Sequence, residues 1–509
     1  MRMNRCNSGT DSKGGLAGFS SLDGRRTVIA VCAGSLCGRT VRYVMKALQI
    51  VFAGLDLWME AHLARAVYCV MDVYCGAPGT GSVLRHECVL RRTGCRLRIR
   101  WREREKIMDE QIYMRRAIEL ARKGEGWCHP NPMVGAVIVK DGRIIGEGYH
   151  ARCGELHAER NAIASLRESA KGATIYVTLE PCCHYGRTPP CTEAIIEQKI
   201  ARVVIGSRDP NPKVSGGGAK VLREAGIEVV EDFLRDECDA LNPVFFHYIT
   251  TKTPYVIMKY AMTADGKIAT KTGASKWITG GEARGRVQQM RHACMGIMAG
   301  IGTVLADDPM LNCRIEGGRD PVRIICDSTL RIPAESAICR TAQEIPTIVV
   351  SAFPELPDGE IAAAENPAKS AVSPAPEAAD AASESKTGAE SIYSKIRSLQ
   401  QCGIRVFNIP DRKDPENSRP DLAELMKQLG KLEIDSILLE GGGTLNESAL
   451  RAGIVQEVRA FIAPKLFGGQ AKTPVEGGGV SVPDEAVQLE YKSAERIGED
   501  LMVTYRVKK

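Results

Sequence analysis

From Met108 onward, apolar segments of strand type alternate with segments of helical periodicity, and this alternation limits the possible folds more strongly than any other feature. A helical pattern that ends at Gly124 precedes two apolar runs joined by Lys-Asp-Gly, which is a hairpin signal. We then expect a helix over 157–170, a strand over 173–180, a helix over 192–199 and a strand over 201–207. This order predicts an α/β/α sandwich with a sheet covered on both faces.

The same kind of pattern restarts near residue 253. Eight strand candidates follow, with helical segments between several of them, at 255–263, 295–301, 322–328, 346–352, 404–409, 435–443, 458–464 and 501–507. We therefore predict two domains, 108–252 and a larger α/β domain over 253–509. The glycine-rich run 215–220 is expected to be a loop of the first domain.

One segment inside the second domain, 354–391, has a different composition. It is rich in Ala, Glu, Ser and Pro and contains no aromatic residue. Such a segment cannot bury enough apolar surface to offset the entropy lost on ordering. It also exceeds the usual loop length, so we predict a disordered insertion without chemistry of its own.

The first 107 residues form an Arg/Cys-rich extension that differs from the rest of the chain. They contain 18 basic and 8 acidic residues and seven of the 18 cysteines, without a clear period. We expect this stretch either to be a disordered basic tether or to be translated from a start codon placed too early. We favour the second interpretation, in which Met108 is the true start, because neither a targeting signal nor a packed pattern is present.

The charge and hydropathy of the chain argue against a nucleic-acid or membrane partner. After residue 107 the chain carries 50 basic and 54 acidic residues, which is the wrong balance for a nucleic-acid groove. The apolar run 47–55 is far shorter than the roughly 20 residues that a membrane span needs. We expect a cytoplasmic protein, whose cysteines would be thiols or metal ligands rather than disulfides.

A metal site is predicted by the stretch "EPCCHYGRTPPC" (180–191) together with His157 and Glu159. A His-x-Glu pair followed by Pro-Cys is typical of zinc deaminases, in which Glu moves protons and is not a ligand. Cys182 would be the second ligand, and the position three residues later, where the third usually stands, is Tyr185. We therefore expect Cys191 to be the third ligand, after a loop of eight residues.

Other assignments of this cluster remain possible from the sequence. Cys183 and His184 are rival ligands, although an extended backbone would turn Cys183 away and His184 would meet substrate or solvent. A closed structural zinc knot or a set of spare thiols is the alternative to a catalytic site. Glu159 argues against a knot, which needs a fourth ligand rather than an acid.

Four segments resemble the deaminase half of the bifunctional riboflavin-biosynthesis deaminase/reductases: "HPNPMVGAVIVKDGRIIGEGYH", "HAE", "TLEPCCHYGRTPPC" and "RDPNPKVSGGG". The resemblance implies a cytidine-deaminase-like fold and a diaminopyrimidinone ribosylamine phosphate as substrate. It implies that zinc activates a water molecule, that Glu159 transfers its proton and that Asn131 contacts the substrate. Asn131 can also be read as a turn residue before Pro132.

The second domain contains "DSILLEGGGTLNESAL" (435–450), in which a buried strand runs into three glycines and then a helix. Gly441, Gly442 and Gly443 would let a phosphate approach the amides of the helix N-terminus. A G-x-G-x-x-G fingerprint does not follow the first strand of this domain, which argues against a Rossmann fold. Alone, such a glycine turn is a weak signal.

Further segments of this domain, among them "KYAMTADGKIAT", "SKWITG" and "MRHACMGIMAGIGTVLADDPMLNCR", are similar to the reductase half of the same family. The likeness implies a dihydrofolate-reductase-like fold and NADPH as cofactor. The implied cofactor contacts are Ala261, Trp277, Thr303, Asp307, Ser328, Gly442, Gly443, Thr444, Leu445, Asn446, Glu447 and Ser448. The implied substrate contacts are Ser275, Arg291, Leu311, Arg314 and Glu440, with Lys259 and Asp265 lining the same pocket.

Each of these residues also has an interpretation without function. Trp277 would then lie in the core, Asp307 and Asp308 would cap a turn before Pro309, and Arg291 would be a solvated helix residue. Ala264 stands where the family often has leucine, which affects local packing only.

The sequence thus predicts a bifunctional enzyme that deaminates the pyrimidine with zinc and then reduces the ribosyl group to ribityl with NADPH. The resemblance also implies a homo-oligomer. The competing hypothesis is a nucleoside or tRNA deaminase whose second domain is not catalytic. That class predicts a Cys-x-x-Cys pair and, for polynucleotides, a basic surface, and neither is present.

Overall fold

The computed structural model describes residues 110–185, 189–211, 214–361, 383–414 and 419–508. The predicted N-terminal extension and much of the predicted insertion lie outside these residues. Within the described part, no helix combines the length and the apolar character that crossing a membrane would require.

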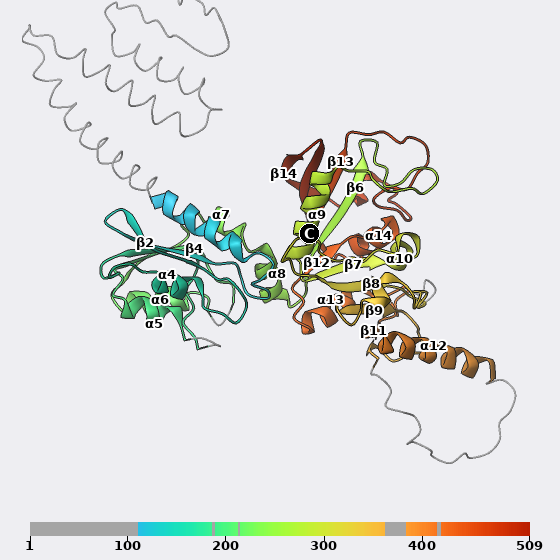
Figure 1. Ribbon diagram of the computed structural model, residues 1–509, viewed down its shortest axis with the longest axis horizontal. Coiled ribbons are helices and arrows are strands. Elements are labelled where there is room, and N and C mark those ends of the chain that lie inside the picture. The colour runs from blue at the N-terminus through green and yellow to red at the C-terminus, as the bar shows by residue number, and fades with distance from the viewer. Residues whose placement is uncertain (1–109, 186–188, 212–213, 362–382, 415–418, 509) are drawn as a thin grey trace, which may run out of the picture. The chain divides into compact units, whose positions relative to one another are not determined.

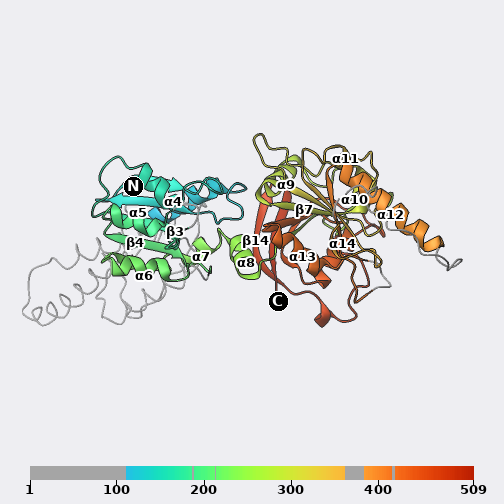
Figure 2. The same cartoon turned by 90° about the horizontal axis from the view of Figure 1, so that it is seen from below.

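A five-stranded mixed sheet forms the first half of the described chain (Figures 1 and 2). Its strands are β1 (Gly135–Lys140), β2 (Arg143–Tyr149), β3 (Thr174–Leu179), β4 (Arg202–Ser207) and β5 (Glu228–Val230). Their order is β2-β1-β3-β4-β5, with β1 antiparallel to both β2 and β3 and the remaining pairs parallel. The predicted hairpin is confirmed, and Asp141 and Gly142 take the positive φ values, 50° and 74°, that a tight turn of this kind requires.

Helices cover both faces of this sheet, as the alternation of the sequence predicts. The helix over 110–121 and α7 (Arg235–Asp239) lie on one face, and a short 3-10 turn, η1 (Arg122–Gly124), follows the first of them. The opposite face packs against α4 (Ala158–Ala164), α5 (Cys191–Glu197) and α6 (Gly217–Glu224). Successive strand residues point to opposite faces, so Ile138 packs on the α4 side and Val137 on the other.

Two local predictions in this half are wrong. The helix after His157 ends at Ala164 rather than near residue 170, because the Ser165 hydroxyl donates to the Ala162 carbonyl and accepts from the Glu147 amide. The run 215–220 is not only a loop, since α6 begins at Gly217. The Glu180 carboxylate accepts hydrogen bonds from the amides of Gly216 and Ala219 and so caps the start of α6.

The second half contains a ten-stranded sheet, preceded by α8 (Pro243–Thr251). Its strands are β6 (Tyr255–Thr263), β7 (Gly296–Gly300), β8 (Val322–Cys326), β9 (Thr347–Ser351), β10 (Gly359–Glu360), β11 (Ile404–Asn408), β12 (Ser436–Leu439), β13 (Val455–Ala463), β14 (Leu489–Ile497) and β15 (Asp500–Val507). The order is β10-β11-β9-β8-β7-β12-β6-β13-β15-β14. Neighbours from β11 through β13 are parallel, and β10, β15 and β14 extend the ends in antiparallel fashion.

Helices also pack on both faces of this sheet. One face meets α13 (Leu422–Lys431) and α14 (Gly443–Arg451), and the other meets α10 (Ile301–Asp307), α11 (Ala337–Arg340) and α12 (Ser383–Gln401). A separate apolar cluster joins α9 (Gly281–Ala293) to β6, β12 and β13, and a 3-10 turn, η4 (Pro483–Glu485), precedes β14. All eight predicted strands are present, whereas β10 and β14 were not predicted.

The structure narrows the predicted insertion. Residues 359–360 form β10 against β11, and α12 begins at Ser383, so both ends of 354–391 carry regular structure. Leu356 is buried in the core on the same side as α12, which gives the N-terminal end of the segment an apolar anchor. Residues 362–382 lie outside the described part of the chain.

An arginine occupies the interior of this domain. Arg323 on β8 is fully buried and donates to the hydroxyls of Thr347 and Thr341 and to the carbonyls of Met310, Ile338 and Ile345. Burial lowers the pKa of its guanidinium to about 10. Uncharged oxygens therefore replace the water that this group loses on folding.

Candidate active sites

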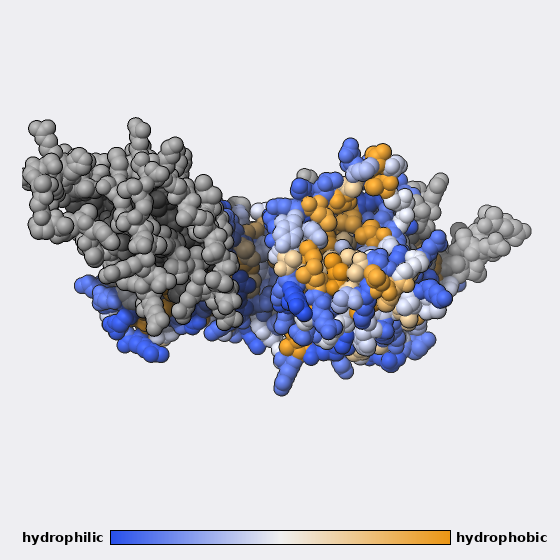
Figure 3. All heavy atoms as spheres, turned by 90° about the horizontal axis from the view of Figure 1, so that it is seen from above, coloured by the Kyte–Doolittle hydropathy of each residue, from blue (hydrophilic) through white to orange (hydrophobic). Residues whose placement is uncertain are grey.

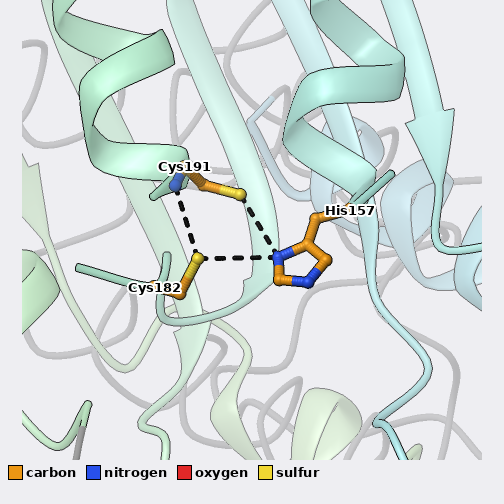
Figure 4. A group of neighbouring side chains, drawn as sticks. All are labelled: His157, Cys182 and Cys191. Atoms are coloured by element: carbon orange, nitrogen blue, oxygen red, sulfur yellow. Dashed lines mark hydrogen bonds between the residues drawn. The ribbon is translucent and has the colours of Figure 1, made fainter. Parts of the chain in front are cut away.

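Three potential metal ligands lie close together near the carboxyl end of β3, the central strand of the five-stranded sheet (Figure 4). The ligand atoms of His157, Cys182 and Cys191 lie within 4.8 Å of one another. His157 Nδ1 is 3.5 Å from the Cys182 sulfur and 3.4 Å from the Cys191 sulfur. One imidazole and two thiols at these distances fit zinc, which prefers nitrogen and sulfur ligands, and three protein ligands leave a fourth position open.

Secondary structure places each of these side chains. His157 is the residue before α4, Cys182 follows β3, and Cys191 is the first residue of α5. The Cys191 amide donates to the Cys182 sulfur at 3.3 Å, and the Thr192 amide donates to the Cys182 carbonyl at 3.2 Å. These contacts return the chain to the metal site after the eight-residue loop that separates the two cysteines.

The rival ligands lie outside this group. Cys183 packs against the start of α6, where a β-carbon on Gly217 would come within 2.8 Å of its sulfur. His184 lines the cavity beside the metal group, and its Nδ1 is buried without a hydrogen-bond partner in the described part of the chain. Among the described residues, it is thus Cys191, and neither Cys183 nor His184, whose ligand atom lies with those of His157 and Cys182.

In the metal-free protein, the thiols of Cys182 and Cys191 shift each other's pKa in opposite directions. The hydrogen bond from Cys191, together with that from His157, lowers the pKa of Cys182 to about 4. The same contact with Cys182, followed by burial, raises the pKa of Cys191. A cation at this place would favour deprotonation of both sulfurs.

Glu159 lies in the first turn of α4, next to the metal group. Its side chain is 3% exposed and lines the cavity. Burial, followed by the negative charge of Cys182, raises the pKa of its carboxyl group. A carboxyl group with a raised pKa can both accept and return a proton near neutral pH.

The metal group opens into a cavity of about 710 Å³. Asn131 lines it, and its side-chain amide lies 3.2 Å from Nε2 of His150. His150 Nδ1 is 3.1 Å from the Leu156 carbonyl, so Nδ1 is the donor and Nε2 the acceptor. The Asn131 amide N–H also closes a turn on the Cys128 carbonyl, so Asn131 is both a turn residue and a wall of the cavity.

Sequence reasoning missed two residues that line this cavity. His150 is 2% exposed and its ring lies edge-on to that of His157, at 5.5 Å between centroids. Asp209 is 7% exposed, and burial raises the pKa of its carboxyl group to about 6. Both belonged to segments quoted above, "GYH" and "RDPNP", but a single His or Asp in a loop carries no spacing signal of its own.

A second group of side chains lies at the carboxyl edge of the parallel strands of the ten-stranded sheet. Glu440 follows β12, Ser328 follows β8 by two residues, and Thr303 lies on α10 directly after β7. Parallel strands direct their carboxyl ends to one edge, where open α/β sheets bind ligands. Ala261 lies towards the end of β6, which pairs with β12 in the same orientation.

Glu440 forms the centre of a buried charge group. Its carboxylate accepts hydrogen bonds from Arg291 Nε at 2.7 Å and Nη2 at 3.1 Å, and Lys259 Nζ lies 3.7 Å away. Burial alone would raise the pKa of Glu440, but the charges of Lys259 and Arg291 outweigh it and lower the pKa to about 2. The side chain of Arg291 is 12% exposed, so it is not a solvated helix residue.

The segment 311–314 adjoins this group. Arg291 Nη1 donates to the Asn312 carbonyl at 3.0 Å, next to the buried Leu311. The Arg314 side chain is exposed, while its amide donates to the Gln288 side chain at 2.9 Å. Each of the three guanidinium nitrogens of Arg291 therefore donates to a protein acceptor, whereas the Arg314 side chain is exposed.

Two loops meet at α10. Lys276 Nζ lies 3.3 Å from the Asp307 carboxylate, which brings Ser275 and Trp277 towards the end of that helix. Trp277 is 62% exposed and its ring lies 4.5 Å from the Arg284 guanidinium, so it is not a core residue. Asp307 thus pairs with a lysine, and its neighbour Asp308 accepts from an amide of α11.

Asp265 does not join the group around Glu440. Its carboxylate accepts hydrogen bonds from the Thr263 hydroxyl and from the amides of Phe467 and Gly468. The bond from Thr263, followed by that from Gly468, lowers the pKa of Asp265 to about 2. Asp265 is therefore a poor proton donor, and its contacts fix the loop after β13.

The three glycines after β12 differ in their surroundings. A β-carbon on Gly442 would meet nothing within 4 Å, whereas one on Gly443 would collide with Thr473 and Glu476. Gly443 is therefore needed for the close approach of the chain around residue 473, and Gly442 is the open position. The Asn446 side chain donates to the Pro474 carbonyl, and its buried Oδ1 faces Gly441 without a partner in the described residues.

The surroundings of α14 fit a cofactor that carries phosphates. The open position at Gly442 precedes the first turn of α14, whose leading amides have no intrahelical acceptor. The remaining predicted contacts on this helix are Thr444, Leu445, Glu447 and Ser448.

Two family models match this chain. Residues 108–207 match the cytidine and deoxycytidylate deaminase zinc-binding region, and residues 254–503 match the RibD C-terminal domain. A second domain without catalytic function is therefore not favoured.

Curated relatives and solved structures agree. The chain is 51% identical over 403 residues to the riboflavin biosynthesis protein RibD of Actinobacillus pleuropneumoniae, covering 79% of this chain and 96% of that protein. Identity to RibD of Escherichia coli is 38% over 416 residues, covering 77% and 98%. A crystal structure of the diaminohydroxyphosphoribosylaminopyrimidine deaminase/5-amino-6-(5-phosphoribosylamino)uracil reductase from Thermotoga maritima is 36% identical with a TM-score of 0.64, covering 79% and 100%.

The predicted fold class is thereby confirmed, as a cytidine-deaminase-like domain followed by a dihydrofolate-reductase-like RibD C-terminal domain. The zinc-binding deaminase region and the RibD reductase domain also establish Zn²⁺ and NADPH as the cofactors. The chain belongs to the RibD family of bifunctional riboflavin-biosynthesis enzymes, which are deaminases and reductases in one polypeptide.

Proposed function

We propose that His157, Cys182 and Cys191 hold the zinc ion and that Glu159 moves protons while the diaminopyrimidinone ribosylamine phosphate is deaminated. The observation that carries this assignment is the convergence of three nitrogen and sulfur ligands within 4.8 Å beside a buried carboxyl group. When bound, zinc supplies the Lewis acidity that makes water a nucleophile near neutral pH.

The residues of the chain account for the proton movements of this reaction. Glu159 accepts a proton from the attacking water, whose oxygen bonds to the ring carbon that carries the amino group. Glu159 returns this proton to the ring nitrogen, and it then moves the second proton from the new hydroxyl group to the amino group. The carbon–nitrogen bond breaks, and ammonia departs. Asn131, oriented by its contact with His150, binds the ring beside the metal.

In the reductase site we assign the Glu440 group to the sugar. When bound, NADPH supplies a hydride, which converts the ribosyl group to ribityl. Lys259, beside Glu440, is the proton source that we assign, because Asp265 has a low pKa and is held by a loop. Arg291 acts through Glu440, whose carboxylate it holds, and the outward-facing Arg314 is the better candidate for the substrate phosphate.

The cofactor contacts are proposed as a set around the carboxyl edge of the sheet. Trp277 and Asp307 lie at the loop beside α10, and the turn at Gly442 receives a phosphate at the start of α14. Support comes from the shared edge of β6, β7, β8 and β12 rather than from any single residue.

Substitution in one site at a time tests these assignments. Glu159→Gln should lower the rate of ammonia release by about 10²-fold or more, the usual size of a general acid–base contribution. The same variant should keep its zinc and still reduce the deaminated intermediate with NADPH. Glu197→Gln, on the exposed part of α5, is the matched control. Unchanged ammonia release in the Glu159 variant would remove the role assigned to it.

The reductase assignment has a matched pair on α9. Arg291→Ala should weaken reduction and spare deamination, whereas Arg286→Ala, whose side chain pairs with Glu495 at the surface, should change neither. Equal loss of both activities in the Arg291 variant would argue against two separate sites.

We also propose the domain limits 108–252 and 253–509. The family matches over 108–207 and 254–503 and the two separate sheets support a boundary near residue 252. Limited proteolysis tests it, and cleavage between the two regions near residue 252 is the expected result.

We also propose that the protein acts in the cytoplasm and forms a homo-oligomer through its reductase domain. Figure 3 shows apolar residues gathered on the face of this domain that lies uppermost in Figure 1, where β13 and β14 are found. The exposed apolar side chains on β14, on β15 and in the chain between β13 and β14 are Leu466, Val475, Val480, Val482, Val487, Leu489, Tyr491 and Leu501. A patch of this kind marks an interface, and we assign a second copy as its occupant. Sedimentation of the Tyr491→Glu variant should show a shift towards monomer, and an unchanged mass would remove this assignment.

A further inference from the structure

We propose that Arg160 is a positioning residue for the zinc site, because its guanidinium holds the segment that delivers Cys191. Arg160 Nε donates to the Pro189 carbonyl at 3.1 Å, and Nη2 donates to the Pro190 carbonyl at 2.9 Å. Pro190 immediately precedes Cys191 and is the residue before α5. The proposal rests on the zinc ligands assigned above.

The first turn of α4 carries both Glu159 and Arg160, whose two hydrogen bonds to the proline carbonyls we call the Arg160 clamp. Arg160 directly follows Glu159, and His157 stands at the start of the same helix. The guanidinium thus ties the helix that carries one ligand and the proton carrier to the chain that carries the third ligand. Its side chain is partly buried, so the contact is made at the border of the site and not in open solvent.

The start of α5 has an unusual need for such support. Its capping position is Pro190, whose side chain has no acceptor for the amides of the helix. Two consecutive prolines have no amide hydrogen, so their own backbone cannot form the amide hydrogen bonds that usually fix a helix entry. The carbonyl oxygens of the two prolines can still accept hydrogen bonds, and one planar guanidinium can donate to both at once.

The length of the loop explains why the clamp matters for metal binding. Eight residues separate Cys182 from Cys191, and a longer connection leaves the second thiol more positions to search before a metal is bound. The amide contacts of Cys191 and Thr192 with Cys182 anchor the loop from the sheet side. Arg160 adds an anchor from α4, so the third ligand is fixed from both directions.

Zinc release from the full-length protein tests the proposal directly. Arg160→Ala should release zinc to a chromophoric chelator about 10-fold faster than the wild type, which is the lower end of what outer contacts of metal ligands contribute. Arg160→Lys should be intermediate, because one ammonium cannot span both carbonyls in the planar arrangement. Reduction of the deaminated intermediate by NADPH should be unchanged in both variants, which shows that they are folded.

Tyr185→Phe is the matched control within the same loop. The Tyr185 hydroxyl donates to the Glu193 carboxylate at 2.8 Å, but the side chain is 72% exposed. Its removal should leave zinc release unchanged. In the cobalt-substituted protein, the thiolate charge-transfer bands should shift in Arg160→Ala, remain in Tyr185→Phe and be partly restored in Arg160→Lys.

Two results would overturn the proposal. Wild-type rates of zinc release in Arg160→Ala would show that the clamp does not position Cys191. Slower deamination with unchanged zinc release and unchanged cobalt bands would assign Arg160 to the substrate instead. A wild-type protein without zinc would contradict the ligand assignment itself, and is thus distinguishable from failure of the clamp alone.

Discussion

The carboxylate of Glu440 lies between Lys259 and Arg291 in a part of the reductase domain that solvent hardly reaches. Its burial opposes ionisation, and only the two cations keep it charged. Removing the charge therefore leaves two buried cations without their counter-ion. The free energy of folding that is lost exceeds the interaction energy of an exposed ion pair, because a buried cation has no water to replace its missing counter-ion.

We expect Glu440→Gln to lower the free energy of unfolding at neutral pH by about 3 kcal/mol. The pKa of Glu440 falls from 4.5 to about 2 on folding, so its contribution is fully present above pH 4.5 and is lost as the pH falls towards 2. Denaturant unfolding of wild type and variant should therefore differ at neutral pH and converge in acid. Glu495→Gln, at the surface, serves as the control. A difference that stayed constant with pH would contradict the role of the ionised form.

The shared proton of Cys182 and Cys191 leads to a prediction about metal uptake. The pKa of Cys182 is lowered and that of Cys191 is raised, so the metal-free pair retains a proton near neutral pH. Zinc binds thiolates, and its binding should release this proton. Calorimetric titration in buffers of different ionisation enthalpy measures the release, which should decrease in Cys191→Ser. Zinc uptake without proton release would show that both sulfurs are already ionised.

Residues with a local signature were predictable, and those that act across the fold were not. His157, Glu159 and Cys182 stand in short motifs whose spacing reflects one helical turn and one strand end. Arg160 acts on carbonyls 29 and 30 residues away, and nothing in its own neighbourhood indicates this.

At the scale of elements, burial on two faces explains which strands could be predicted. The central strands, such as β7 and β12, are apolar along their length because helices cover both sides. The edge strand β14 is exposed at every position except Ile497 and carries polar residues on both faces, so it has no apolar period. Strand β10 has two residues and is defined only by its pairing with β11.

At the start of α6, Gly218 packs closely against Pro181, the residue before Cys182. A β-carbon on Gly218 would come within 2.0 Å of the Pro181 carbonyl, directly before Cys182. We expect Gly218→Ala to lower the free energy of unfolding by about 2 kcal/mol, as overpacking does, and to weaken zinc binding. Gly285→Ala on α9, where nothing lies within 4 Å, should be neutral or slightly stabilising. Thermal melts and zinc titration check both variants, and normal zinc binding by Gly218→Ala would show that Pro181 can move freely.

At the scale of the whole molecule, the two chemistries depend on different groups. The proposed zinc ligands come from the deaminase region, and the Glu440 group comes from the reductase sheet. Removal of zinc by a chelator should therefore abolish ammonia release and leave reduction of the deaminated intermediate by NADPH intact. Restoration of the first activity on adding zinc back is the control. Loss of both activities on chelation would mean that the reductase half depends on the metal for its folding.

Arg323 fixes how the reductase sheet is aligned. Its five acceptors belong to the start of β9, to α11 and to the loops beside them, so a slip of β8 by one residue would break all of these bonds together. Asp327 and Ser328 emerge directly after this strand, and their position at the sheet edge is therefore set by a guanidinium at the far end of β8. The alignment of β8 by a single desolvated cation is thereby passed on to the sheet edge where we propose that the dinucleotide binds.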